Sequence, residues 1–413
     1  MTNQLGCSLG VSLIIFSVVL SLWSGTGIMG LRYQVTSFDN PENYLLPVVI
    51  LLLLFFTESL DRTGRMERTV TALKIWLKDK KMLLAGLPAL VGLLPMPAGA
   101  AFSAPLVASV DSEEELGDAH KAAINYWFRH LWEYWWPLYP GVLLAITYSG
   151  LPAAIFYLIQ IPFTLAAAAA GYFFILRKIK RNTAELSKNG VLNYRAVFSA
   201  LGPIGVLVTL SVIGSVFLTF IGISGSLSSL IAMLIGLIMA TVTAFFGNTS
   251  AWIPSLGFFK RRNTWLMLIL VIGIQAFSAV LKSPLNAPGT TLVTLMRDEF
   301  INAGVPILAV IMLLPFISGM VTGTAFGFVG ASFPIVFALV GQNPPLGTSA
   351  AITSCAYAFG YIGMIISPIH ACFVVSCEYF NTPVLGTYRY IAGPCLFIIM
   401  TSLILSGLYY LLI

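Results

Sequence analysis

The chain has 413 residues, of which 58% are hydrophobic and only 9% are charged. A soluble protein carries about 25% charged residues, so this composition excludes an ordinary soluble domain and predicts an all-α polytopic membrane protein. We interpret the net charge of +6 as Lys and Arg in cytoplasmic loops rather than as a nucleic-acid surface, because the basic residues lie in short segments between apolar stretches.

Nine apolar stretches approach or exceed the roughly 20 residues that a bilayer-crossing helix needs. In chain order, the predicted spans are 9–31, 44–60, 120–149, 151–176, 196–220, 224–246, 264–281, 348–377 and 389–413. The first lacks the basic residues that precede the apolar core of a signal peptide, and we interpret it as a retained span.

Two more apolar stretches, 82–110 and 305–340, are interrupted by proline, glycine or hydroxyl residues. Each can be a kinked span or a re-entrant hairpin of two half-helices. For the first stretch, charge decides between these alternatives. The loops 61–81 and 177–195 are rich in Lys and Arg, which predicts that both are cytoplasmic.

The two spans between these loops, 120–149 and 151–176, already return the chain to the side on which it started. The stretch 82–110 therefore should not cross, and we predict a hairpin that enters from the cytoplasm. We interpret 305–340 as a second hairpin because of its likeness to the first. Counting spans then places the N-terminus on the cytoplasmic side of the cell membrane and the C-terminus on the outer side.

These elements predict an inverted repeat, a recurring build of secondary transporters in which the site lies near the midplane of the bilayer. The predicted units are 1–176, with hairpin 82–110 and broken helix 120–149; 177–223, a basic loop and connecting helix; and 224–413, with hairpin 305–340 and broken helix 348–377.

The first broken helix carries charged residues among aromatic ones, in the stretch NYWFRHLWEYWWPLYP. Asn125, Arg129 and Glu133 are spaced by four and share one helical face, with His130 beside it. A charge at bilayer depth is costly unless it faces protein, water or a partner. Arg129 and Glu133 can form a structural ion pair. Alternatively, Arg129 binds an anionic group, and His130 or Glu133 couples transport to a proton or cation.

The second broken helix contains the sequence SPIH. Ser367 and Pro368 form a helix-start signal, with Ser as N-cap and Pro in the first helical position. A half-helix that begins there would direct its free N–H groups toward an anion. His370 lies in its first turn, and either a neutral buried role or a ligand or proton role is open.

The tips of the two predicted hairpins differ in chemistry. The first is apolar, and the second is rich in hydroxyl groups and glycine, which suits contacts to a substrate or cation, although glycine also serves close helix packing. The tip residues are Pro95, Pro97 and Gly99 in the first hairpin, and Ser318, Gly319, Thr322, Gly323 and Thr324 in the second.

The sequence predicts no metal site and no cofactor. The five cysteines form no CxxC pair and there are only three histidines, which disfavours structural zinc and iron–sulfur chemistry. An intramembrane enzyme is the less favoured alternative, because HExxH and paired aspartates are absent from the sequence. A channel or a lipid translocase is the other alternative.

The stretches LPMPAGAAFSAP and NYWFRHLWEYWWPLYPG, together with SPIHACFVVSCEYF in the second half, resemble the integral-membrane family described as domain of unknown function 401. This family is grouped with the ion transporter superfamily, alongside gluconate, dicarboxylate and citrate carriers. The resemblance implies paired hairpins, an organic-anion substrate, coupling to H⁺ or Na⁺, and a homodimer that works by elevator motion. The Ser-Asn-Thr motif of the dicarboxylate carriers is missing from both tips.

Together, these patterns predict a secondary active transporter of a small organic anion, coupled to H⁺ or Na⁺, and not an enzyme. We expect substrate contacts from Asn125, Arg129, Ser318, Thr322, Thr324, Ser367, Pro368 and His370, and ion coupling by His130 and Glu133. Membrane lipid surrounds the protein in this prediction.

Overall fold

The structure is a computed structural model, and it describes residues 9–24, 26–64, 79–93, 99–111, 115–179, 194–246, 251–285, 290–341 and 344–413. The described chain is helical and contains no named strand, and an isolated bridge joins Pro284 to Thr291. The predicted all-α class is therefore confirmed.

The first half of the chain contains three helices followed by a series of shorter and broken ones. Its elements are α1 (Leu9–Trp23), α2 (Gly27–Thr36), the 3₁₀ turn η1 (Ser37–Asp39), α3 (Pro41–Arg62), α5 (Lys80–Gly92), α6 (Gly99–Val110), α7 (Asp118–Arg129), the 3₁₀ turn η2 (Leu131–Tyr134), α8 (Pro140–Ser149), α9 (Ala153–Ala170) and the π-helical turn η3 (Gly171–Leu176).

The second half has the same alternation of long and broken helices. Its elements are α10 (Tyr194–Phe220), α11 (Gly225–Phe245), α12 (Trp252–Leu256), the 3₁₀ turn η5 (Gly257–Lys260), α13 (Arg262–Lys282), α14 (Leu292–Asn302), α15 (Ile307–Thr322), α16 (Ala325–Val340), α17 (Leu346–Ile365), α18 (Ala371–Tyr379) and α19 (Val384–Leu412).

Six helices of the described ranges are long and apolar enough to cross a membrane: α3, α9 with η3, α10, α11, α13 and α19. Each corresponds to one predicted span, and the chain is an integral membrane protein. The other predicted spans are interrupted. The break in 120–149 separates α7 from α8, and the break in 348–377 separates α17 from α18.

The prediction of a single span over 9–31 is wrong, because α1 ends at Trp23 and the chain turns back. Three hydroxyl groups close this turn: Thr26 Oγ1 contacts the hydroxyl oxygens of Ser21 (3.1 Å) and Ser24 (3.2 Å). The Gln34 side-chain amide then donates to the Ser17 carbonyl at 3.4 Å, so α2 packs against α1 rather than extending it.

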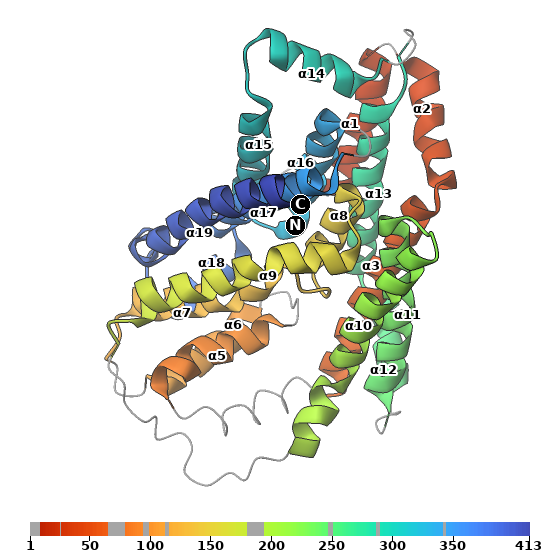
Figure 1. Ribbon diagram of the computed structural model, residues 1–413. Helices are drawn as coiled ribbons and strands as arrows, with labels where there is room; N and C mark the ends of the chain where they lie inside the picture. The colour runs from red at the N-terminus through yellow and green to blue at the C-terminus, as the bar shows by residue number, and fades with distance from the viewer. Residues whose placement is uncertain are drawn as a thin grey trace.

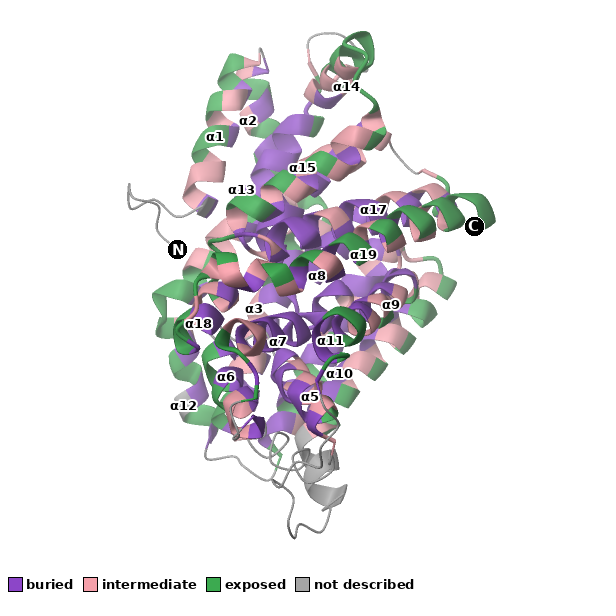
Figure 2. Ribbon diagram, turned by 90° about the vertical axis from the view of Figure 1, so that its left-hand side faces the viewer, coloured by how far each residue is buried: buried purple, intermediate pink, exposed green. Residues whose placement is uncertain are grey.

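The helices form two groups, which lie side by side in Figure 1. Helices α3, α10, α11 and α13 stand upright on one side, where α11 contacts both α10 and α3 and α13 contacts α1 and α3. The broken helices gather on the other side with α9 and α19. Figure 2 shows that the burial is greatest around α7, whose residues Ala122–Arg129 are all buried, whereas α10 and α19 expose much of their surface.

Two pairs of short helices occupy the stretches predicted as hairpins. Helices α5 and α6 contact each other, as do α15 and α16. In the second pair, Gly323 ends α15 with φ of +60° and Thr324 caps α16 by accepting from the Gly327 N–H. The turn of the first pair includes residues 94–98, which lie outside the described ranges, and with them the predicted tip residues Pro95 and Pro97.

The second arm of each pair contacts a half-helix from the other half of the chain. Helix α6 packs on α18, and α16 packs on α8. Gly141 of α8 allows the latter approach, because a Cβ there would meet the Ala325 backbone at 2.9 Å. This reciprocal arrangement is the one that an inverted repeat would give, and the division at 176 and 224 stays a prediction.

Candidate functional site

The centre of the molecule is where the two broken helices meet. Asn125 is fully buried on α7, and its amide group donates to the Ala100 carbonyl of α6 at 3.1 Å and to Ser376 Oγ of α18 at 2.9 Å. One α7 side chain therefore joins the first hairpin-like pair to the second broken helix. Its Oδ1 atom has no hydrogen-bond partner among the described residues.

Helix α7 ends at Arg129, and the chain continues through the 3₁₀ turn η2 to Pro137. A proline has no N–H to continue a helix. Carbonyls in such a break must find other donors, since an unpaired buried carbonyl is costly. Tyrosines provide them: Tyr357 to the Glu133 carbonyl (2.6 Å), Tyr361 to His130 (3.1 Å), Tyr126 to Ile365 (2.8 Å) and Tyr388 to Ile366 (2.7 Å).

The tryptophans of the same stretch cap the end of α5. Trp132 Nε1 donates to the Ala89 carbonyl at 2.8 Å, and Trp136 Nε1 donates to the Leu93 carbonyl at 2.8 Å. These bonds satisfy carbonyls that a helix leaves free in its last turn. The aromatic residues that interrupt α7 thus also hold the first hairpin-like pair.

Arg129 is 3% exposed. Its guanidinium group lies against Gly99 at the start of α6, where a Cβ would collide with the guanidinium nitrogens. It also lies in hydrogen-bonding range of the Cys372 thiol, at the start of α18. The first turn of a helix presents free N–H groups and a positive dipole end. A guanidinium and two such helix starts therefore share one buried region, which suits an anion.

His130 and His370 meet across the two breaks. Their Nε2 atoms are 3.1 Å apart, and the two side chains are 1% and 6% exposed. The Glu133 carboxylate lies 3.8 Å from His130 Nε2. Because α7 stops at Arg129, Glu133 lies on the 3₁₀ turn η2 rather than on the same α-helix. The Arg129–Glu133 ion pair stays a prediction. This group of titratable side chains can exchange a proton between segments of both halves.

The predicted helix start at Ser367 and Pro368 is wrong by three residues. Helix α18 begins at Ala371, and His370 occupies the N-cap position without a side-chain cap bond. The Ser367 hydroxyl instead donates to the Met320 carbonyl of α15 at 2.7 Å, and Pro368 lies in a turn closed by the His370 N–H and the Ser367 carbonyl (3.2 Å). A tertiary hydrogen bond has replaced the local cap.

The second tip touches this turn. A Cβ at Gly323 would lie 3.1 Å from the backbone nitrogen of His370, so the tip backbone packs against the loop before α18. The hydroxyls of the tip make local bonds: Thr322 donates to the Ser318 carbonyl at 2.7 Å, and Thr324 caps α16. Gly319 packs on the α17 backbone, where a Cβ would meet the Gly360 carbonyl.

The structure thus brings seven of the fifteen predicted site residues into one region, and it adds some that the sequence did not indicate. Asn125, Arg129, His130, Glu133 and His370 surround the meeting point of the breaks, with Gly99 and Gly323 at its edges. The residues missed from the sequence are Cys372 and the capping tyrosines Tyr126, Tyr357, Tyr361 and Tyr388. The only sequence signal for them was their position within apolar stretches, which many residues share.

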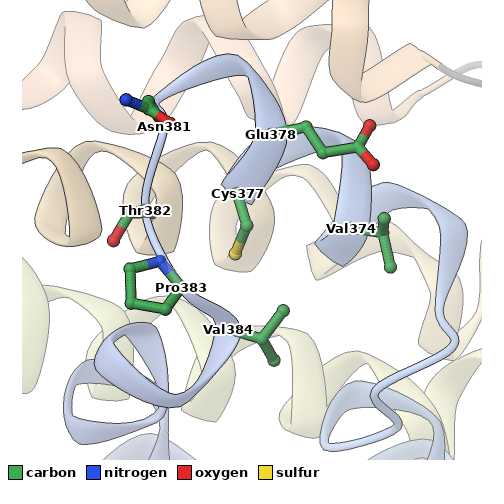
Figure 3. Close-up of a pocket in the computed structure, with 7 residues that line it drawn as sticks. All are labelled: Val374, Cys377, Glu378, Asn381, Thr382, Pro383 and Val384. Carbon is green, nitrogen blue, oxygen red and sulfur yellow. The ribbon is translucent and has the colours of Figure 1, made fainter.

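An open pocket of about 480 Å³ lies elsewhere, at the junction of α18 and α19. Figure 3 shows its lining residues, with the Cys377 sulfur directed inward and the Glu378 carboxylate at one side. None of the predicted site residues that the structure describes lines it, so we do not assign the substrate to this pocket.

Comparison with solved structures finds similarity to the YdaH transporter of Alcanivorax borkumensis, described as having an unusual topology, with a TM-score of 0.65 and 15% sequence identity over 97% of each chain. No curated protein sequence matches the chain. Residues 4–413 match the family described as "Protein of unknown function (DUF401)". The chain therefore belongs to the DUF401 family and shares its fold with a transporter.

Proposed function

We propose that the chain is a secondary active transporter of a small organic anion, coupled to H⁺ or Na⁺. The observation that carries this proposal is the position of Arg129. A permanently charged side chain, 3% exposed, lies between the starts of α6 and α18. Intramembrane charges are retained at sites of substrate or ion passage, and a guanidinium matches the planar geometry of a carboxylate.

Ion coupling is assigned to the group around His130. A neutral imidazole has one nitrogen that can accept a proton, and His130 contacts His370 and lies near Glu133. A proton held here would alter the field at the adjacent Arg129, so anion and proton binding would influence each other. The hydroxyls of Thr322 and Thr324 are the proposed contacts if Na⁺ is the coupling ion.

The two-sided architecture supports alternating access by an elevator-type movement. In this proposal, the broken helices and both hairpin-like pairs carry the substrate past the upright helices α3, α10, α11 and α13 (Figure 1). The likeness to the YdaH transporter fold supports transport in general. A homodimer in the cell membrane, with the N-terminus in the cytoplasm, completes the proposal.

The test is thermal unfolding of purified protein with small carboxylates, sugar acids and phosphonates, with and without Na⁺ and across pH. A ligand at about 100 times its Kd adds roughly 2.7 kcal/mol of stability. Compounds that stabilise the protein are then tested for saturable uptake into proteoliposomes. We expect Arg129→Ala to lose both stabilisation and uptake.

Arg389→Ala is the matched control, because Arg389 is exposed and contacts the neighbouring Tyr390 ring and hydroxyl. It should retain both responses. Full ligand stabilisation and uptake by Arg129→Ala would refute the anion site. Conductance without saturation would indicate a channel, and activity only with lipid substrates would indicate a lipid translocase.

A further inference from the structure

A cluster of metal-ligating atoms lies at the meeting point of the two broken helices. One ligand atom each from His130, His370 and Cys372 lies within 4.8 Å of the other two. His130 and His370 are buried, and Cys372 is partly buried. The residues come from the end of α7 and the start of α18, 240 positions apart in the case of the histidines. Their spacing along the chain therefore gave no metal-binding motif.

The hydrogen bonds of His130 prepare one of its nitrogens as a ligand. Its Nδ1 lies 2.6 Å from the Tyr126 carbonyl. A carbonyl only accepts, so Nδ1 carries the proton, and in the neutral ring Nε2 then offers a lone pair. A bond from the second ring nitrogen to a carbonyl is the usual support of a metal-bound histidine. The ring is also fixed by Tyr126, whose ring centroid is 4.8 Å away.

The distances are close to those of a tetrahedral zinc site. Zinc–nitrogen bonds of about 2.0–2.1 Å separate two imidazole nitrogens by roughly 3.3–3.4 Å, and the Nε2 atoms of His130 and His370 are 3.1 Å apart. A zinc–sulfur bond of about 2.3 Å requires a nitrogen–sulfur separation of roughly 3.6 Å. The Cys372 sulfur lies within 4.8 Å of one ring nitrogen of each histidine, which exceeds that separation by at most about 1.2 Å.

The ligand types favour a borderline divalent metal. Imidazole and thiolate select Zn²⁺ and similar ions over Mg²⁺ and Ca²⁺, which prefer oxygen ligands. The Arg129 guanidinium lies beside Cys372, and the thiolate is the form of cysteine that binds metal. The Glu133 carboxyl group, 3.8 Å from His130 Nε2, lies at the edge of the cluster.

We propose that His130, His370 and Cys372 bind Zn²⁺ or a chemically similar divalent metal. When the metal binds, the proton between the two Nε2 atoms moves to His370 Nδ1, so both rings stay neutral. The Cys372 thiol gives up its proton, which is released to solvent. It also joins α7 to the loop and helix start at α18, and it would hold the two broken helices in their present relation. The proposal goes beyond the transport function and does not depend on it.

The test uses untagged, full-length protein in detergent, freed of metal by a chelator and titrated with Co²⁺. Tetrahedral cobalt bound to thiolate and imidazole gives visible d–d bands and a thiolate-to-cobalt charge-transfer band. We expect both in the wild type at one equivalent, and we expect Zn²⁺ to abolish them by displacement. Absence of the charge-transfer band from the wild type would overturn the proposal, without reference to any variant.

Two pairs of variants identify the ligands. Cys372→Ser should remove the charge-transfer band, and His370→Asn should weaken Zn²⁺ binding by roughly 10-fold or more, the loss expected even for an outer-shell partner. Their matched controls are Cys377→Ser, since Cys377 contacts Thr387, and His120→Asn, since His120 stacks on Tyr390. Both controls should bind like the wild type. A band that persists in Cys372→Ser would also overturn the proposal.

Discussion

The hydrogen bond from Tyr357 to the Glu133 carbonyl should hold the first break in shape. The residue four positions after Glu133 is Pro137, which has no N–H to offer. Among the described residues, Tyr357 is the donor that this carbonyl has, at 2.6 Å. Replacing Tyr357 with Phe keeps the ring in its buried place and removes only the donor. The change therefore isolates one capping bond.

The expected loss in the free energy of unfolding can be judged by comparing Tyr357 with Tyr361. A buried acceptor left without a donor costs about 1–3 kcal/mol, and interhelical hydrogen bonds in membrane proteins average about 0.6 kcal/mol with a maximum near 1.7. We expect Tyr357→Phe to lower the free energy of unfolding by about 1–2 kcal/mol. Tyr361→Phe should cost about 0.6 kcal/mol or less, because the His130 carbonyl keeps a second donor, the Glu133 N–H at 3.2 Å.

The assay is reversible unfolding in mixed micelles of increasing SDS content, with the free energy of unfolding compared among variants. Tyr157→Phe is the matched control, because Tyr157 is 3% exposed and its hydroxyl has no hydrogen-bond partner among the described residues. It should be neutral or slightly stabilising. If Tyr357→Phe behaved like Tyr157→Phe, or cost less than Tyr361→Phe, the carbonyl-capping argument would be refuted.

Two further substitutions test the packing and the charge balance of the fold. Gly319→Ala should lower the free energy of unfolding by roughly 1–3 kcal/mol, because its Cβ would meet the Gly360 backbone. Gly205→Ala is the control and should not lower it, because Gly205 faces open space. Equal unfolding midpoints for the two variants would contradict this. Lys80→Met should cost about 3–5 kcal/mol, because it leaves Asp111, whose side chain is 0% exposed, without its ion pair at 2.9 Å. Adding Asp111→Asn should restore much of that loss, and no recovery would count against the ion pair.

Hydropathy predicted the long helices well, because a bilayer imposes one length and one composition on a crossing helix. It failed at 9–31, where apolar residues continue through a turn that Ser21, Ser24 and Thr26 close by hydrogen bonds. Three hydroxyls barely change the average hydropathy of such a stretch, yet they decide where the helix ends.

The site could be predicted only in part. Arg129, His130 and Glu133 were evident because charged or titratable residues in an apolar stretch require an explanation. Cys372 and Tyr357 were not, because their roles depend on contacts with residues far away in the sequence. The helix-start signal at Ser367 failed for the same reason, since its hydroxyl bonds to Met320 on another helix.

The interlocking of the broken helices bears on how the chain enters the membrane during synthesis. The His130 ring contacts His370, and the carbonyls of His130 and Glu133 accept hydrogen bonds from Tyr361 and Tyr357. These partners come more than 220 residues later in the chain. At about 5–20 residues per second, a ribosome needs roughly 12–48 s to make the intervening 240 residues. For that time, Arg129 and its neighbours wait without their C-terminal partners. The stretch 118–149 should therefore remain at the insertion machinery or in contact with a chaperone until α17 and α18 have emerged.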